Sequence, residues 1–175
     1  MTAARGAPGE WVLLSYRLPR EPSTPRIAVW RKLKRLGVAQ ISDGLVALPA
    51  DARTREQLEW VAEDVADGGG SASIWLARPA TRAQEDQLAE TMATARAAEY
   101  RAVIEAAAQA ADGNPTARAS AVRRLRGELR AIQRRDYFPP TEHDQAQAAL
   151  QGLGGDSAAD RPAGSADRRA GARPA

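Results

Sequence analysis

Residues 11–49 read WVLLSYRLPREPSTPRIAVWRKLKRLGVAQISDGLVALP, in which three short apolar runs surround one amphipathic stretch. The first run, residues 11–18, predicts a β-strand whose side chains alternate between the two faces of a sheet. VAQI and LVALP predict two further strands. A tight turn at Asp43-Gly44 joins them, because glycine tolerates the positive φ that such turns need.

The stretch between the first two strands predicts a helix from residue 25 to about residue 36. Thr24 is suited to the N-cap and Pro25 to the first helical position, where its missing N–H would have no partner. Gly37 supplies the C-terminal stop. On a helical wheel Val29, Trp30, Leu33 and Leu36 face the sheet, Arg26 lies over the Trp30 indole, and the opposite arc carries Arg31, Lys32, Lys34 and Arg35.

A second helix is predicted over residues 54–66, and the glycines at 68–70 end it. Residues 71–78, SASIWLAR, predict a fourth strand. The order strand-helix-strand-strand-helix-strand is typical of the ferredoxin-like split βαβ fold, in the α+β class. Right-handed crossovers then place both helices on one face of a four-stranded antiparallel sheet.

Two additional helices are predicted after the sheet. Thr81 and Gln84 form a capping box for a long helix over residues 82–111, and Asn114 caps a last helix that reaches about Arg135. Beyond about residue 141 the composition is mostly Ala, Gly, Asp, Arg, Ser and Pro, which predicts disorder. We therefore expect a flexible N-terminus (1–9), a ferredoxin-like core (10–79), a helical extension (80–138) and a disordered tail (139–175).

The outer face of the predicted sheet carries Trp11, Leu13, Ser73 and Trp75, which point away from the two packing helices. Two tryptophans are seldom left in water, so either the C-terminal helices or a partner covers this face. We expect partial cover by the C-terminal helices. Trp11 and Trp75 are then the candidate partner contacts.

The net charge is +3, but it is unevenly distributed. Residues 1–36 carry 8 basic and 2 acidic side chains, residues 37–112 carry 6 and 13, and residues 113–135 carry 7 and 1. The chain has 23 Arg and 2 Lys, so arginine number alone is a weak signal, yet both lysines lie in the first helix. Two basic blocks around an acidic middle indicate an anionic partner.

The final helix, like the first, carries almost only positive charge, and Glu128 is its single acidic residue. Both surfaces are open to two interpretations: a solvated charged face, or a face that binds phosphates and gives affinity without base readout. The candidate nucleic-acid contacts are Arg31, Lys32, Lys34 and Arg35 in the first helix, and Arg123, Arg124, Arg126 and Arg130 in the last.

Several other chemistries are excluded or disfavoured. The sequence has no cysteine, which excludes disulfides, thiol catalysis and thiolate metal sites. Its one histidine, His143, falls in the polar tail and is predicted to be solvated. Neither G-x-x-x-x-G-K-[ST] nor a strand-linked G-x-G-x-x-G is present. We therefore expect no enzyme, no metal and no other cofactor.

Membrane insertion is also not expected. No apolar run approaches the roughly 20 residues that cross a bilayer. The polar N-terminus has no signal-peptide pattern, so a cytoplasmic location is expected.

Three segments together suggest a family. Residues 11–49, the later IWLARP (74–79) and the closing RRDYFP (134–139) resemble the N-terminal domain of ChrB, the chromate-resistance regulator family, over about residues 10–138. The resemblance implies a cytoplasmic bacterial stress-response protein that controls transcription of a chromate-efflux operon, with DNA as its partner. Family members usually continue into a C-terminal domain, so this chain is expected to be a stand-alone version.

Three hypotheses follow. The first is a DNA-binding regulatory module without enzymatic activity. The second is a protein-interaction module that uses the Trp11/Trp75 face to form a homodimer or to dock a separately encoded C-terminal chromate-resistance domain. The third is direct binding of the chromate oxyanion by the basic loop and first helix.

Overall fold

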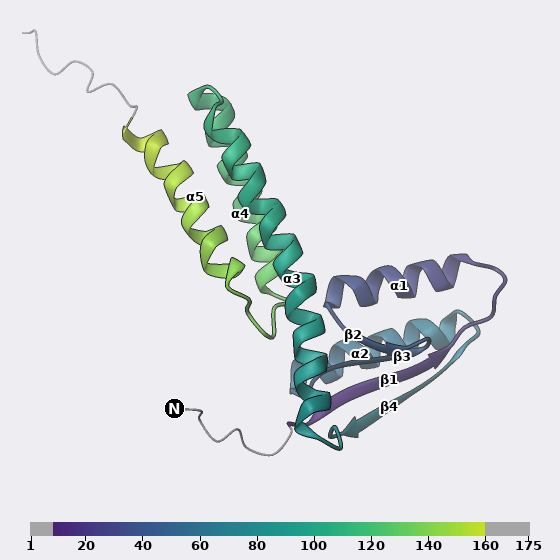
Figure 1. Cartoon of the computed structure of the whole chain (residues 1–175). Helices are drawn as coiled ribbons and strands as arrows, with labels where there is room; N and C mark the ends of the chain where they lie inside the picture. Colours follow the sequence, from purple (N-terminus) through teal and green to yellow (C-terminus); the bar gives the residue numbers. More distant parts are fainter. Residues whose placement is uncertain (1–8, 160–175) are drawn as a thin grey trace, which may run out of the picture.

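The computed structural model describes residues 9–159, which form a sheet domain and a bundle of helices that projects from one end of it (Figure 1). The α+β class is confirmed, with the predicted β-α-β-β-α-β order followed by three helices. The elements are β1 Trp11–Arg17, α1 Thr24–Leu36, β2 Ala39–Ser42, β3 Leu45–Pro49, α2 Ala52–Asp67, β4 Ser71–Ala77, α3 Arg82–Ala111, α4 Pro115–Gln133 and α5 Glu142–Ala159.

The four strands form one antiparallel sheet in the order β2-β3-β1-β4, which agrees with a ferredoxin-like arrangement. Val12 and Leu14 of β1 are fully buried in a core shared with the buried side chains of α1 and α2. Leu13 lies opposite Ala47 and Trp75 in the neighbouring strands. Paired residues share a face of the sheet, so these three belong to the outer face.

Helix α1 lies within one residue of its predicted ends. Ser23 is at the N-cap position, Pro25 is in the first turn, and Gly37 ends the helix in the left-handed conformation (φ 73°). A Cβ at position 37 would lie 2.5 Å from Arg96 Nη1 and 3.0 Å from the Arg135 carbonyl oxygen. Glycine is therefore required here both by the backbone and by the close approach of α3 and of the segment after α4.

Gly44→Ala is expected to destabilise the fold by about 1–3 kcal/mol. Gly44 has φ 73° in the β2–β3 turn, and a Cβ there would collide with the Tyr16 carbonyl oxygen. The measurement is the midpoint of thermal or urea unfolding. Gly127→Ala is the matched control: Gly127 lies inside α4 with nothing within 4 Å of an added Cβ, so this change should stabilise the protein by about 0.5–1 kcal/mol.

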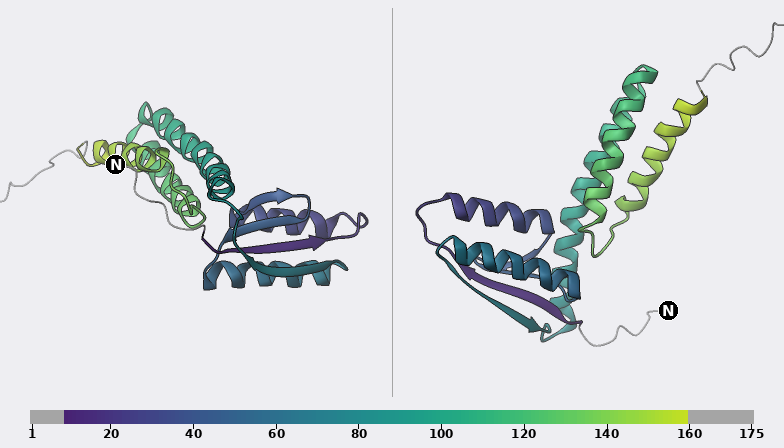
Figure 2. Two further views of the ribbon diagram at one scale, coloured as in Figure 1. Left: turned by 60° about the horizontal axis from the view of Figure 1, so that its bottom comes forward. Right: turned by 180° about the vertical axis from the view of Figure 1, so that it is seen from behind.

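Two hydrophobic cores are present among residues 9–159, and α3 passes through both. Met92 belongs to the core of the sheet domain, whereas Tyr100 and Val103 belong to a second core. We call the second unit the helical arm: the C-terminal half of α3 together with α4 and α5. Figure 2 shows the arm extending away from the sheet in two further views. The predicted buried stripe of α4, Val122, Leu125, Leu129 and Ile132, lies in this core.

The prediction of a disordered tail from about residue 141 is wrong for its first part, because residues 142–159 form α5. Ala146, Leu150 and Leu153 are spaced at i, i+4 and i+7 and pack into the core of the arm. This apolar stripe is narrow and begins with alanine, so the composition of the segment did not indicate a helix. The stripe becomes buried only because it packs against α3 and α4. Residues 160–175 lie outside the described residues.

His143 is correspondingly not a solvated tail residue. Its ring meets the Tyr100 ring edge-on, with centroids 5.5 Å apart, and its Nε2 lies 3.4 Å from Gln133 Nε2. His143 therefore helps to pack the start of α5 against α3 and the end of α4.

Candidate nucleic-acid interface

The basic side of α1 is exposed, but its four cations differ in what they contact. Lys32 points toward α2 and forms an ion pair with Asp64 at 2.5 Å. Arg31 and Arg35 are exposed and make no ion pair with any residue that the structure describes. On the wheel they lie opposite Val29 and Leu33, the buried residues of α1, and so face away from the sheet.

Trp30 is half exposed, and the prediction that it packs on the sheet is wrong. Lys34 lies over its ring at 5.5 Å from the centroid, in the place predicted for Arg26. Arg26 instead donates a hydrogen bond to the Arg20 carbonyl oxygen at 3.4 Å. On the helical wheel of α1, Trp30 lies at the margin of the apolar arc. Val29 and Leu33 lie at the centre of that arc and are the residues of α1 that become buried. An exposed indole with a lysine above it adds a stacking surface to the basic face.

Helix α4 carries the second basic surface. Arg123, Arg126 and Arg130 are exposed, as is Arg124, which pairs with Glu128 one turn along the same helix at 2.7 Å. All four lie outside the buried stripe of α4, which faces the core of the arm. The sequence prediction that these arginines are free to meet a partner is thus compatible with the packing of α4.

The two basic helices end at the same place. The Gly37 end of α1 lies against Arg135, and Arg53, at the start of α2, donates a hydrogen bond to the Arg134 carbonyl oxygen at 3.4 Å. Figure 1 shows the lower end of α4 next to the end of α1 beside α3. Arg53 and Arg134 are exposed and add positive charge between the two predicted surfaces. Sequence reasoning did not select them, because their proximity depends on long-range packing.

A bridge of three charged residues holds this meeting point together. Glu99 of α3 forms ion pairs with Arg96 at 3.0 Å and with Arg135 at 2.5 Å, and the second of these is also a hydrogen bond. Arg96 is 8% exposed. Next to them, the Tyr100 hydroxyl donates to Asp136 at 2.7 Å, and burial followed by this hydrogen bond raises the pKa of Tyr100. Together these contacts connect the sheet domain to the helical arm, and we call them the junction.

Glu99→Gln is expected to lower the free energy of unfolding by about 1–3 kcal/mol. The change removes the negative charge that separates two arginines, whose Nε atoms are already buried without a partner among the described residues. The measurement is urea unfolding followed by circular dichroism. The control is Glu128→Gln, which breaks the exposed Arg124 pair and should change stability by less than about 0.5 kcal/mol. Equal effects of the two changes would contradict a role for Glu99 in the junction.

The RRDYFP segment has a structural explanation at this junction. Phe138 stacks on Trp11 with ring centroids 5.9 Å apart and planes 20° apart. Arg53 lies over the Tyr137 ring at 5.8 Å. Asp136 accepts a hydrogen bond from Tyr100 of α3. Tyr137 and Phe138 therefore fasten the end of α4 to the sheet domain, and Asp136 fastens it to α3.

The prediction that Trp11 contacts a partner is wrong, because Trp11 is 2% exposed. Phe138 covers the Trp11 ring, and Met92 of α3 packs in the same core. The Trp11 Nε1 donates a hydrogen bond to Glu85 at 3.3 Å. The expected partial cover by the C-terminal helices is thus what buries it. Trp75, at the far side of the same face, is 59% exposed and stays available.

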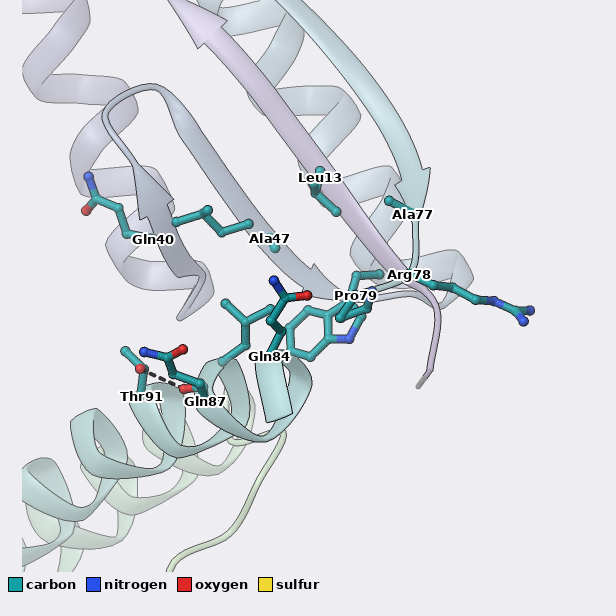
Figure 3. A pocket seen from close by; sticks show the side chains of 12 residues that line it. Leu13, Gln40, Ala47, Ala77, Arg78, Pro79, Gln84, Gln87 and Thr91 are labelled. Atoms are coloured by element: carbon teal, nitrogen blue, oxygen red, sulfur yellow. Dashed lines mark hydrogen bonds between the residues drawn. The ribbon is translucent and has the colours of Figure 1, made fainter. Parts of the chain in front are cut away.

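Between the covered and open parts of the outer face lies a cleft of about 400 Å³ (Figure 3). Its floor includes Leu13 and Ala47 of the sheet, and its wall includes Gln84 and Gln87 of α3. Figure 3 shows Arg78 extending away from the cleft, and the one interaction drawn inside joins the Thr91 hydroxyl to the Gln87 carbonyl oxygen, at 2.8 Å. The cleft has amides at its rim but no charged group aimed into it.

Two further observations limit the chemistry of residues 9–159. Among the side chains that the structure describes there, no group of three or more His, Asp or Glu residues is placed to hold a metal ion. None of the helices described there is long and apolar enough to cross a membrane.

Comparison with known proteins gives one family. The family model for the N-terminal part of protein ChrB matches residues 26–112. Protein ChrB of Cupriavidus metallidurans is 31% identical over 146 residues, which are 81% of this chain and 44% of that relative. The chain therefore spans less than half the length of this relative. No solved structure matches the chain.

Proposed function

The chain belongs to the ChrB N-terminal domain family, and from this premise we propose that it is a DNA-binding regulatory protein of a chromate-resistance system. In this proposal it acts in the cytoplasm, has no enzymatic activity, and controls transcription of a chromate-efflux operon. The observation that supports DNA binding is the pair of strongly basic helices, α1 and α4. Their C-terminal ends meet at the junction.

The electrostatics of α1 support phosphate contact more than a purely solvated role for this helix. Exposed helices commonly balance arginine with nearby glutamate, as Arg55 and Glu59 do at 2.8 Å in α2. In contrast, α1 contains no acidic residue, and its outermost cations Arg31 and Arg35 form no ion pair among the described side chains. Unbalanced cations on a rigid helix release counterions from DNA when they meet phosphates, which favours binding at low salt.

The arrangement also limits what kind of binding is proposed. Arginines spread along one side of a helix can follow a phosphate backbone and set the position of the protein on a duplex. Selection of an operator needs contacts to base edges or to a sequence-dependent DNA shape. We therefore assign α1 and α4 to affinity and positioning, and leave operator selection outside this assignment.

The test is binding of the chain to duplex DNA from the promoter of the efflux operon, measured over a range of salt concentrations. The expected result is an affinity that falls linearly, on logarithmic axes, as salt rises. An unrelated duplex of equal length is the control, and tighter binding to the promoter would support the regulatory part. An affinity that does not depend on salt would overturn the proposed phosphate contacts.

A further inference from the structure

Strand β4 is an open edge of the sheet. It pairs with β1 along its whole length, from Ser71 to Ala77, and no other strand within residues 9–159 lies along its second side. Such an edge presents free N–H and C=O groups, and proteins usually protect it with charges, a proline or a bulge. The sequence of β4, SASIWLA, contains no charge and no proline, and its register with β1 has no irregularity.

The opposite edge of the sheet is built differently. Strand β2 has four residues, and its register with β3 shifts between Gln40 and Ser42. A short, irregular strand is a poor template for pairing. The two edges are thus unequal, and β4 is the one able to accept another strand.

The side chains of β4 point to the same conclusion. Trp75 and Leu76 are 59% and 53% exposed, and as consecutive residues of a strand they lie on opposite faces of the sheet. A cover over one face would leave the other residue in water. A strand added alongside β4 would flank both residues at once.

We propose that this strand belongs to a second copy of the chain, whose β4 pairs with β4 in antiparallel fashion and makes a continuous eight-stranded sheet from two four-stranded ones. With Ile74 on the two-fold axis, Trp75 lies opposite Ser73 of the second copy. Leu76 then lies opposite Ala72 of the second copy. On both faces of the paired sheet, a large side chain of one copy lies opposite a small side chain of the other. The β4 strands of two copies are therefore complementary in side-chain size.

Charge does not oppose this approach. The flank of α2 turned away from α1, and hence toward the β4 edge, is opposite Asp64 and carries Arg55, Glu59 and the small residues Ala62 and Ala66. Arg55 and Glu59 neutralise each other at 2.8 Å. This flank of α2 is therefore neutral, whereas α1 and α4, which are strongly basic, lie elsewhere. The exposed Arg78 follows the last residue of β4, away from the two-fold axis at Ile74.

A consequence rests on the proposed DNA-binding function. In the paired sheet, the helices on one face follow the order α1, α2, α2 of the second copy, α1 of the second copy. Three helix spacings of about 10 Å put the two α1 helices about 30 Å apart. That separation is close to the roughly 34 Å between half-sites one turn apart on DNA. The dimer would thus present two basic faces to one side of a duplex.

The test is sedimentation of the full chain and of variants, up to the highest soluble concentration. We expect the wild type to have twice the mass of one chain. Trp75→Lys and Ser73→Lys should each halve that mass, because both place like charges beside the two-fold axis without touching the core. Trp60→Lys is the matched control: Trp60 is 50% exposed on α2, outside the proposed contact, and the variant should stay a dimer.

A wild type of single-chain mass would overturn the proposal and would mean that another segment or another partner covers β4. Retention of the double mass by Trp75→Lys and Ser73→Lys would overturn it as well, since the dimer would then use another surface. The DNA experiment is independent of these outcomes. A monomer that binds DNA in a salt-dependent way would refute only the proposed dimer. A dimer that does not bind DNA would refute only the proposed function.

Discussion

Trp11→Ala is expected to lower the free energy of unfolding by about 3–5 kcal/mol, the usual cost of emptying a buried tryptophan site. The indole lies where three parts of the chain meet: β1, the first half of α3, and the segment after α4 that contributes Phe138. Its removal would leave a cavity between β1, α3 and Phe138, and would remove the hydrogen bond that its Nε1 donates to Glu85. The loss would be a large part of the roughly 5–15 kcal/mol that holds most domains folded.

The measurement for Trp11→Ala is urea unfolding, with the midpoint and slope analysed together. Trp60→Ala is the matched control, since it removes the same side chain from a half-exposed site and should change stability by about 0.5 kcal/mol or less. Phe138→Ala offers a second view of the same contact. If Trp11→Ala cost no more than Trp60→Ala, the assignment of Trp11 to the core would be wrong.

Replacement of both Arg31 and Arg35 by glutamine is expected to have the largest effect on DNA binding. Each arginine that contacts a phosphate adds about 1 to the slope of log affinity against log salt, so the pair should reduce that slope by about 2. Both side chains face solvent and neither is part of an ion pair among residues 9–159, so the fold should not change. Affinity should fall alike for promoter and unrelated DNA, because phosphates carry no sequence information.

The control for this prediction removes the same charge from elsewhere. Arg82 and Arg101 pair with Glu85 and Glu142, at 2.7 and 2.9 Å, and lie on α3 rather than on α1 or α4. Their double replacement by glutamine should leave the slope almost unchanged. A second pair, Arg123→Gln with Arg130→Gln, reports whether α4 binds the same duplex. An unchanged slope for the Arg31/Arg35 variant would remove α1 from the interface.

In the proposed dimer, Trp75 has a role that differs from the one expected for the outer face. The sequence pattern placed Trp11 and Trp75 together as one partner-binding surface. In the structure they lie on the same face of the sheet, in the adjacent antiparallel strands β1 and β4. Helix α3 and Phe138 cover Trp11 but leave Trp75 exposed. The surface left for a partner has therefore moved to the β4 edge.

Local patterns predicted the strands and the first four helices closely. Alternation in residues 11–17, the Asp43-Gly44 turn and the Thr81/Gln84 capping box all appear in the structure, because each depends on neighbours a few residues apart. The ends of α2 were less accurate. Asp51 caps this helix by accepting from the Thr54 backbone N–H at 2.6 Å, which places its start at Ala52.

The failures concern contacts between distant segments. Helix α5 was missed because a stripe of Ala146, Leu150 and Leu153 gains stability only in the groove between α3 and α4. Lys32 resembled its basic neighbours in sequence, yet its ammonium pairs with Asp64, a residue 32 positions later. Of the eight predicted phosphate contacts, Arg31 and Arg35 are now the best placed on α1, and this ranking came from geometry.

The amino-acid sequence alone determined the order of elements, the α+β class and the two basic helices, because hydrophobic period, caps, turns and charge are properties of short segments. The tertiary structure decided which tryptophan is buried, which lysine is neutralised, where the basic helices meet and which sheet edge stays open. These depend on the docking of α3 and the RRDYFP segment against the sheet, and that docking is a sum of long-range contacts. Periodicity shows which side of an element is apolar, but only packing shows what covers it.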